Sequence, residues 1–359
     1  MESTSQSGTA EAESPHIELS VIVPARNEQD ALPACLESLL AQTDEAFLLG
    51  RDWELILVDD HSSDKTREIM AAAAATAGVM LLDAPEASEN SGFTGKNGAC
   101  WAGAQAAGGR LLLFTDADTI HLPGDLSRAR HELDRYKVKL LSYSPRQLTV
   151  GLLQQALMPL VFAELAVAYP TARVNAPEDP IAAANGQFLM VVAEDYFAVG
   201  GHRAVGEQVL EDVALARNFK RSRRPIRFRY APDALSARMY RSTGAMLEGW
   251  VKNLALLYSS ALGVGLLRLL DFALIVGIPA VALLFPFLSL LQKALLWVVW
   301  IRVLWRFYAR VRKSNFPAMD CALALLGIPL FSWICFSSWY RVKVKKQVAW
   351  KGRVYPVKR

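Results

Sequence analysis

Two aspartates separated by one residue, Asp116 and Asp118, have the spacing of a cation-binding pair. They lie in the segment 110–120 (RLLLFTDADTI), whose apolar part has the length and composition of a buried strand. Neighbouring carboxylates repel each other unless a cation lies beside them. A hard divalent ion held by one or two carboxylates completes its shell with water and substrate phosphates. The pattern favours half of a metal–diphosphate site; the alternative is a solvated turn, in which Asp is common.

Three further apolar runs precede these aspartates, at residues 17–24, 53–58 and 79–83. Each run is followed by a helical pattern. The first pattern places on one face Leu32, Leu36, Leu39 and Leu40. The second is an Ala-rich helix that we expect to end at Gly78, and the third is a small-residue helix from about Asn97 to Ala107.

Strands that alternate with helices predict an α/β fold, with a mostly parallel sheet covered by helices on both faces. In such sheets, ligands bind beyond the carboxyl ends of the strands. Four polar side chains fall at these ends: Asn27, Asp59, Asp60 and Asp116. The sequence therefore predicts a binding site at this edge of the sheet.

Four motifs in this order carry a family resemblance: VIVPARNE (21–28), LILVDDHSSDKT (55–66), GKNGACWAGAQAAGG (95–109) and LLLFTDADT (111–119). Together they resemble the nucleotide-binding half of family 2 glycosyltransferases, which have the Rossmann-like GT-A fold. The resemblance is strong over residues 18–120 and weaker towards the C-terminus. It implies a nucleotide-sugar donor, which we expect to be a UDP-sugar, and a divalent cation, Mn²⁺ or Mg²⁺.

The resemblance also assigns roles to individual residues. Asp60, with Asp59, would accept the base N–H, and residues 24–28, including Pro24, Asn27 and Glu28, would line the base and ribose. Asp116 would contact the ribose or the metal, and Asp118 would be the metal ligand proper. Lys96 would face the acidic groups of the nucleotide; the alternative is a solvated loop lysine.

A paired carboxylate, Glu211 and Asp212, opens a later helical pattern. A like-charged neighbour and partial burial raise a carboxyl pKa, which suits a general base. The resemblance places the catalytic base at Asp212, with Glu211 as its neighbour. The alternative, which is compatible with catalysis, is an acidic pair that stabilises the helix dipole.

Two further positions are candidates for the acceptor site. The five histidines lack zinc-ligand spacing, so we interpret His202 as an acceptor-loop contact or as a structural residue. Asn185, Gly186 and Gln187 precede an apolar run, and they predict either the edge of the acceptor site or a plain turn into a strand.

Long apolar stretches follow the predicted catalytic domain. Segments 269–291 and 318–340 are long enough to cross a bilayer, which takes about 20 residues. Segments 254–267 and 295–308 are shorter or interrupted by Arg, and either could be a short span or lie in the membrane interface. If the catalytic domain and the Lys-rich tail are both cytoplasmic, the number of crossings is even, two or four.

The stretch 241–253 is amphipathic and could deliver a lipid headgroup to the catalytic domain. Membrane enzymes of family 2 often carry an Arg-Trp motif here; this chain keeps Trp250 without it, and Arg241 and Lys252 are further candidates. With residues 350–355 (WKGRVY), this departure resembles the hopanoid-associated and carotenoid (diaponeurosporenoate-type) branch more than the processive polysaccharide synthases. The alternative for residues 350–355 is a basic, aromatic membrane anchor.

The expected organisation is a disordered tail (1–16), a GT-A domain (17–240), an interfacial segment (241–253), a transmembrane region (254–340) and a basic cytoplasmic tail (341–359). The N-terminus has neither the basic start nor the apolar core of a signal peptide. Four cysteines without paired spacing indicate a reducing compartment. The net charge of +4 is too small to imply nucleic-acid binding.

These observations predict a multi-pass protein of the plasma membrane. Its expected reaction is the inverting, metal-dependent transfer of one sugar to a terpenoid-like membrane lipid. Two alternatives belong to other classes. A nucleotidyltransferase would show a Gly-rich basic loop where this chain reads PARNE, and a non-catalytic scaffold would not need Asp60, Asp118 and Asp212 together.

Overall fold

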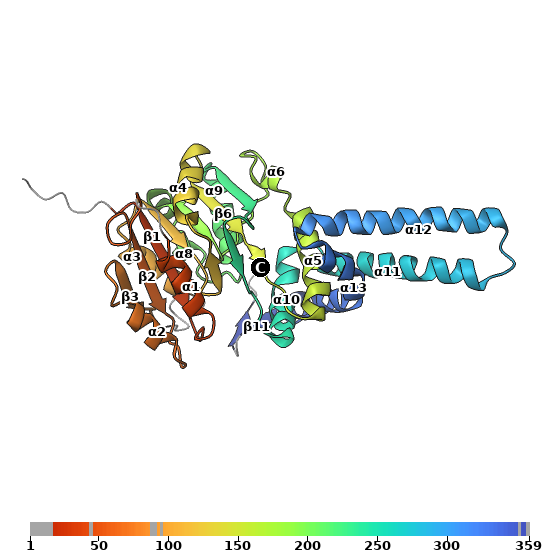
Figure 1. Ribbon diagram of the computed structural model, residues 1–359, viewed down its shortest axis with the longest axis horizontal. Helices are drawn as coiled ribbons and strands as arrows, with labels where there is room; N and C mark the ends of the chain where they lie inside the picture. The colour runs from red at the N-terminus through yellow and green to blue at the C-terminus, as the bar shows by residue number, and fades with distance from the viewer. Residues whose placement is uncertain (1–16, 43–45, 87–91, 94–95, 351–352, 357–359) are drawn as a thin grey trace, which may run out of the picture.

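The structure, a computed structural model, describes residues 17–42, 46–86, 92–93, 96–350 and 353–356. The predicted disordered tail, residues 1–16, lies outside this range. A domain built on a β-sheet is followed by a group of helices, from which two long antiparallel helices project (Figure 1).

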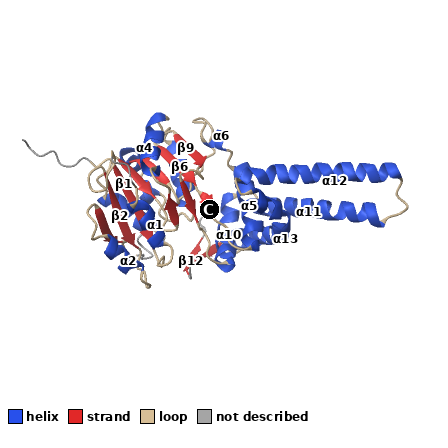
Figure 2. Ribbon diagram, in the orientation of Figure 1, coloured by secondary structure: helices blue, strands red, loops and turns tan. Residues whose placement is uncertain are grey.

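The main sheet has seven strands in the order β3-β2-β1-β4-β8-β6-β9 (Figure 2). Their bounds are β1 Leu19–Ala25, β2 Trp53–Asp59, β3 Val79–Asp83, β4 Leu111–Phe114, β6 Leu140–Ser144, β8 Leu189–Val192 and β9 Ile226–Tyr230. Strand β1 pairs in parallel with β2 and β4, and only β8 runs antiparallel to its neighbours among these seven. The predicted α/β fold with a mostly parallel sheet is confirmed.

Side chains of β1 alternate between two apolar layers because successive residues of a strand point to opposite faces. Leu19, Val21 and Val23 pack into one layer, with the helices α1 (Leu32–Leu40), α2 (Thr66–Ala73) and α4 (Asp125–Arg135). Ile22 packs into the other layer, with α3 (Lys96–Ala106) and α9 (Glu211–Arg221). The helices therefore hold both faces of the sheet and fix the strand ends where the polar residues lie.

One of the expected helix bounds is wrong, and the bounds expected for a second helix differ from the structure by one residue. Helix α2 ends at Ala73, well before Gly78, and Gly78 instead adopts a positive φ of +85° in the turn that packs against Gly50. Helix α3 begins at Lys96, so this lysine belongs to the first turn of a helix and not to a loop. On α1, Leu40 is partly exposed, and Cys35 takes the expected place in the buried face.

Shorter elements complete the first domain. A second sheet in the order β5-β10-β7 consists of β5 Thr119–His121, β10 Leu235–Ala237 and β7 Arg146–Gln147. It carries the chain away from Asp118 and brings residues 238–241 back beside it. The short helices are α6 Thr171–Val174, α7 Ala193–Ala198 and α8 Gly201–Ala204.

The helical part contains α5 Leu152–Ala168, α10 Thr243–Leu257, α11 Ala261–Leu284, α12 Leu290–Val311 and α13 Ala318–Trp339. Helix α13 continues as a π-helix, Tyr340–Val344, and a hairpin of β11 (Gln347–Trp350) and β12 (Arg353–Pro356) follows. Helix α5 lies within the expected catalytic segment, yet its apolar side chains share a core with α10 to α13. The sequence interpretation did not single out this helix.

Two helices, α11 and α13, are long and apolar enough to cross a membrane. The first expected span, 269–291, has wrong bounds, because the helix ends at Leu284 and the chain turns around Pro286 into α12. The ambiguous segment 254–267 is divided between α10 and α11, and 295–308 is the interior of α12.

Candidate functional site

A cavity of about 500 Å³ opens at the carboxyl ends of the central strands. It is bounded by the end of β1, the loop after β4, the start of α3, the turn before β8, the start of α9 and one face of α10. Residues singled out from the sequence that line it include Pro24, Glu28, Asp60, Lys96, Asp116, Asp118, Gly186, Gln187, Glu211 and Asp212. The fold thus brings together side chains that are up to 188 positions apart in the sequence.

The two adjacent aspartates at the end of β2, Asp59 and Asp60, have different surroundings. Asp60 is buried and lines the cavity, and its carboxylate lies 3.7 Å from the guanidinium of Arg26. Asp59 does not line the cavity; it accepts a hydrogen bond from the backbone N–H of Ser62 and lies 3.6 Å from Arg67. The expected contact of Asp59 with the base is therefore not supported by its position.

Asn27 also lies outside the cavity lining. Its φ is +53°, and its side-chain oxygen accepts a hydrogen bond of 2.8 Å from the backbone N–H of Ser63. Asn27 therefore ties the loop after β1 to the loop after β2, and the expected direct contact with ribose is not supported.

Lys96 joins the two halves of the cavity. Its ammonium group forms an ion pair with Asp116 and lies 3.5 Å from the Glu211 carboxylate. Burial opposes its charge, but the carboxylates of Asp116 and Glu211 outweigh this and raise the pKa of Lys96 well above its ordinary value. The solvated loop lysine considered above is excluded by this geometry.

Asp118 lies on the loop after β4 and lines the cavity. Burial, the Asp116 carboxylate and the Glu28 carboxylate raise its pKa to about 7. The side-chain amide of Gln187 donates a hydrogen bond of 3.5 Å to it. The Asp116 and Asp118 carboxylates repel each other, and a divalent cation bound beside them would remove this repulsion.

Among the described residues, no group of three or more His, Cys, Asp or Glu side chains could hold a metal by itself. Asp116 and Asp118 therefore fit a cation whose remaining ligands come from water and a substrate diphosphate, as hard cations with few protein ligands require.

Asp212 lies at the start of α9 and faces the same cavity. One of its oxygens accepts a hydrogen bond of 2.9 Å from the backbone N–H of Gly186, and the other accepts from Val213 N–H at 2.7 Å. Burial and the neighbouring Glu211 raise its pKa to about 7. Both sequence interpretations of this pair are compatible with the geometry, since the carboxylate lies in the first turn of α9 and also lines the cavity.

Gln187 holds the turn before β8 against the acidic loop. Its carbonyl accepts a hydrogen bond from the Thr115 hydroxyl at 2.8 Å, and its side-chain oxygen accepts from Gln147 at 2.9 Å. Gly186 beside it lacks a side chain where a Cβ would lie 2.9 Å from the Lys96 ammonium nitrogen. Both residues line the cavity.

His202 and Trp250 lie outside the cavity lining, so its geometry does not support their placement as acceptor contacts. His202 is buried, with its ring nitrogen 2.8 Å from the Tyr196 hydroxyl oxygen, and burial lowers its pKa to about 3. Trp250 is buried in the helical core, where its indole N–H points to the sulfur of Met158. Both side chains are packed in the protein interior. For His202, this is the structural role that the sequence analysis gave as the alternative.

Helix α10 presents other residues to the cavity: Ala245, Lys252 and Asn253. Arg238, Met239, Tyr240 and Arg241, which precede this helix, also line it. Arg241 and Lys252 were candidates from the sequence. Tyr240 and Asn253 were not assigned to the site from the sequence. For Asn253, the register in which α10 packs decides which residues of the helix face the cavity.

Part of the chain matches a known protein family. Residues 20–158 match the family described as glycosyl transferase family 2. Residues 20–158 of this chain therefore form a family 2 glycosyltransferase domain. Its match covers the strand ends that hold Pro24, Asp60, Asp116 and Asp118, whereas Asp212 lies beyond it.

Named relatives align with nearly the full length of the chain. The chain is 26% identical to the 4,4'-diaponeurosporenoate glycosyltransferase of Staphylococcus haemolyticus over 347 residues, which cover 95% of this chain and 89% of that protein. It is 25% identical to the enzyme of the same name from Staphylococcus aureus, with the same coverage. Among solved structures, it is similar to a mannosyltransferase from Pyrobaculum calidifontis in complex with GDP-Man and Mn²⁺, with 15% identity, coverage of 92% and 88% of the two chains and a TM-score of 0.49.

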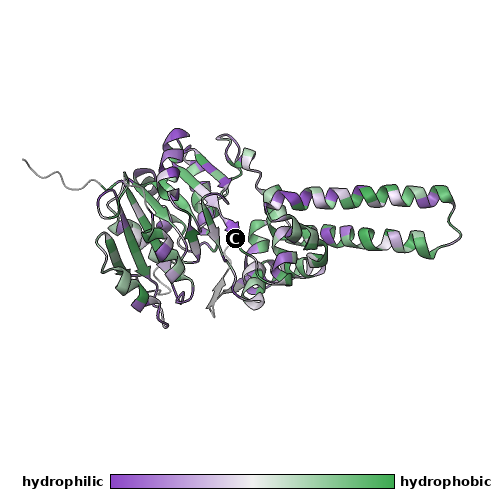
Figure 3. Cartoon of the chain, in the orientation of Figure 1, coloured by the Kyte–Doolittle hydropathy of each residue, from purple (hydrophilic) through white to green (hydrophobic). Residues whose placement is uncertain are grey.

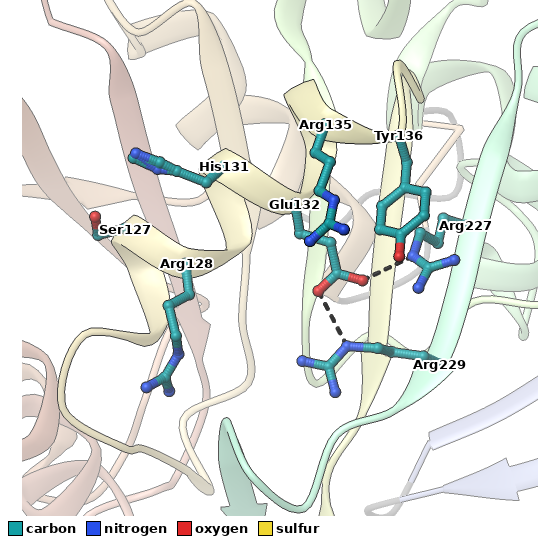
Figure 4. A pocket seen from close by; sticks show the side chains of 8 residues that line it. All are labelled: Ser127, Arg128, His131, Glu132, Arg135, Tyr136, Arg227 and Arg229. Carbon is teal, nitrogen blue, oxygen red and sulfur yellow. Dashed lines mark hydrogen bonds and ion pairs between the residues drawn. The ribbon is translucent and has the colours of Figure 1, made fainter.

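The first domain has a second cavity, of about 430 Å³, between α4 and the edge strand β9 (Figure 4). Glu132 lies at its centre and accepts hydrogen bonds from Arg227 at 2.7 Å and from Arg229 at 3.1 Å. Arg227 also lies over the ring of Tyr136. This cluster is an ion-paired brace between a helix and the sheet edge, and it contains none of the site residues expected from the sequence.

Proposed function

We propose that this protein transfers one sugar from a nucleotide-diphosphate sugar to a carotenoid-type or other terpenoid lipid dissolved in the membrane. The observation that carries the proposal is the single cavity that joins Asp60, the Asp116–Lys96 ion pair and Asp212 on one side to α10 on the other. Donor and acceptor groups can therefore meet in one place. The relatives' named acceptor, 4,4'-diaponeurosporenoate, supports a carotenoid-type lipid.

The donor occupies the end of the cavity nearest β1 and β2. Asp60, held beside Arg26, accepts a hydrogen bond from the base, while Pro24 and Glu28 border the base and ribose. Lys96 lies near the position of the diphosphate, where its charge favours binding of an anion. A UDP-sugar is the donor that we propose.

Asp116 and Asp118 would hold Mn²⁺ or Mg²⁺ together with the donor diphosphate. When bound, this cation supplies charge neutralisation to the departing diphosphate. The protein's own contribution is the fixed position of the two carboxylates: Lys96 orients Asp116, and Gln187 orients Asp118.

Asp212 is the base that we propose for the acceptor. The Gly186 N–H orients one carboxylate oxygen, and a pKa of about 7 lets the group accept a proton near neutral pH. The oxygen of a hydroxyl acceptor, which gives its proton to Asp212, attacks the anomeric carbon from the face opposite the diphosphate, and the bond from this carbon to the diphosphate oxygen breaks. The reaction therefore inverts the configuration of the sugar.

The acceptor enters from the side of α10, because this helix shares one face with the cavity and another with the apolar core of the helical part. The protein is proposed to lie on the cytoplasmic face of the plasma membrane, since basic residues follow the apolar helices.

The experiment that tests this function is turnover by the purified full-length protein in lipid vesicles. UDP-sugars are supplied with carotenoid acids or hydroxylated terpenoids, and both the nucleotide product and the glycolipid are measured. We expect UDP and a glycosylated lipid in equal amounts. Release of UMP with diphosphate would indicate a nucleotidyltransferase, and no donor turnover with any lipid would indicate a scaffold.

A further inference from the structure

Helices α11 and α12 form a hairpin whose outer half is almost free of charge. Between Asp271 and Arg302 the sequence has one charged residue, Lys293. Figure 3 shows that most of this outer half is hydrophobic. The turn is strongly exposed: Leu283, Leu284, Phe287, Leu290 and Leu291 each expose 70% or more of their surface.

The base of the hairpin has the opposite character. Asp271 of α11 forms ion pairs with Arg268 on the same helix and with Arg306 of α12. Glu164 of α5 accepts a hydrogen bond from Arg310 at 3.1 Å. These interactions hold the charged residues of α5, α11 and α12 next to one another at the base of the hairpin.

Three arginines mark the same level on α12. Arg302, Arg306 and Arg310 are spaced four residues apart along α12, so they share one face. The guanidinium of Arg302 lies 5.2 Å from the centre of the exposed Trp305 ring. Arginine beside exposed tryptophan is typical of the headgroup level of a membrane.

Between this level and the turn, each leg is short. The charge-free part of α11 covers 13 residues, 272–284, and the part of α12 between the turn and Arg302 covers 12 residues, 290–301. At 1.5 Å per residue these legs are about 20 Å and about 18 Å long. The hydrocarbon core of a bilayer is about 30 Å thick, so neither leg can cross it.

The turn can lie in hydrocarbon because it satisfies much of its own hydrogen bonding. A bilayer core offers no partners to an open backbone. Ser289 and Gln292 form a reciprocal capping box, the Phe285 N–H donates to the Val281 carbonyl, and Pro286 has no N–H. This need explains why two polar residues occur at an otherwise apolar tip.

The second long apolar helix, α13, does not extend along this outer half. Near its start, the Ala322 carbonyl accepts a hydrogen bond from Tyr308 of α12, and further on Ser332 donates to the Gly265 carbonyl of α11. Both contacts lie on the base side of the Asp271–Arg306 pair. Half of α13 is buried against other helices.

We propose that α11 and α12 are a re-entrant hairpin, which enters the bilayer from the face that carries the catalytic domain and does not cross it. This inference rests on the proposed membrane association, and it replaces the even number of crossings expected from the sequence. The catalytic cavity and the termini of the hairpin then lie on the same side of the membrane.

Thiol labelling tests the proposal with the full-length protein. Phe287→Cys places a thiol at the turn, and Ala34→Cys places one on the exposed face of α1 as the control. The four native cysteines are buried, so their background is low. A membrane-impermeant maleimide is applied to inside-out and right-side-out vesicles, then after detergent.

We expect Ala34→Cys to react only in inside-out vesicles and Phe287→Cys to react only after detergent. Reaction of Phe287→Cys in right-side-out vesicles would show a crossing and overturn the proposal. Reaction in inside-out vesicles, like the control, would show that the hairpin never enters the bilayer. In that case, sedimentation distinguishes failure of the hairpin proposal from failure of the proposed membrane association. A protein found in the soluble fraction would refute membrane association as well.

A second variant keeps the test independent of thiol chemistry. Leu284→Lys with Phe287→Lys places two charges at the tip, and Leu40→Lys on α1 is the matched surface control. We expect the tip variant to move from the membrane to the soluble fraction, with an unchanged unfolding midpoint in detergent. Unchanged membrane attachment of the tip variant would contradict a tip in hydrocarbon.

Discussion

The backbone N–H of Gly186 donates a hydrogen bond of 2.9 Å to the carboxylate of Asp212, 26 residues further along the chain. The turn before β8 thereby fixes the orientation of the proposed base. The same glycine leaves room for Lys96, whose ammonium nitrogen would lie 2.9 Å from a Cβ at this position. Two groups of the site, the Asp212 carboxylate and the Lys96 ammonium group, therefore depend on one residue without a side chain.

Gly186→Ala should lower activity by roughly tenfold, with little loss of stability. The new methyl group meets the flexible end of Lys96, which can move, but its pairing with Asp116 and Glu211 is then disturbed. Gly103→Ala is the control: its methyl group would lie 2.5 Å from Ile22 in the core, which should cost about 1–3 kcal/mol of stability. Comparison of kcat and thermal unfolding for both variants checks this, and equal stability losses would contradict it.

The rate of transfer should rise with pH through about 7. The active form of Asp212 is ionised, and burial with Glu211 raises its pKa to about 7, so activity is low at pH 6 and levels off above pH 8. The measurement is kcat against pH for a hydroxyl acceptor. A profile that falls over this range would exclude Asp212 as the base.

Lys96→Met should weaken donor binding by about tenfold and move the pH profile to higher values. The Lys96 charge lowers the pKa of Asp212, so its removal leaves this carboxyl harder to ionise. Lys96→Arg should restore part of the binding because it keeps the charge. Calorimetry with UDP and the pH profile test both effects; a profile that stays in place would show that the two groups do not interact.

Asp118→Asn should lower kcat by a factor on the order of 10²–10³ and raise the Mn²⁺ concentration needed for half-maximal rate, because a neutral amide is a poorer ligand for a hard cation. Asp83→Asn, an exposed acid paired with Arg67, is the control and should change little. If the variant needed no more Mn²⁺ than the parent, Asp118 would not be a metal ligand.

The strands could be predicted because buried parallel strands are continuous apolar runs, and the polar residues at their ends define one edge of the sheet. Assignments of individual side chains to the cavity failed where tertiary packing determines which side chain faces it. Asp59 and Asp60 are adjacent at the end of β2, and only one of them can face the cavity. Trp250 is buried while Lys252 on the same helix lines the site, which depends on the rotation of α10.

The hairpin was missed for another reason. Residues 269–291 form one apolar window, and membrane helices tolerate proline, so the sequence does not distinguish a kink at Pro286 from a turn. The structure shows the turn, together with the ion pair between Asp271 and Arg306 that lies at its base.

The most direct test of the account is Asp212→Asn, measured for UDP binding and for sugar transfer to a hydroxylated lipid in the same vesicles. Glu211→Gln is the matched control, since it changes the neighbouring acid and leaves the Gly186 hydrogen bond to Asp212 in place. We predict that Asp212→Asn lowers transfer by a factor on the order of 10²–10⁴ and changes the Kd of UDP by less than about threefold. Transfer close to the parent rate, or a loss of UDP affinity as large as the loss of rate, would contradict the role of Asp212 as the base.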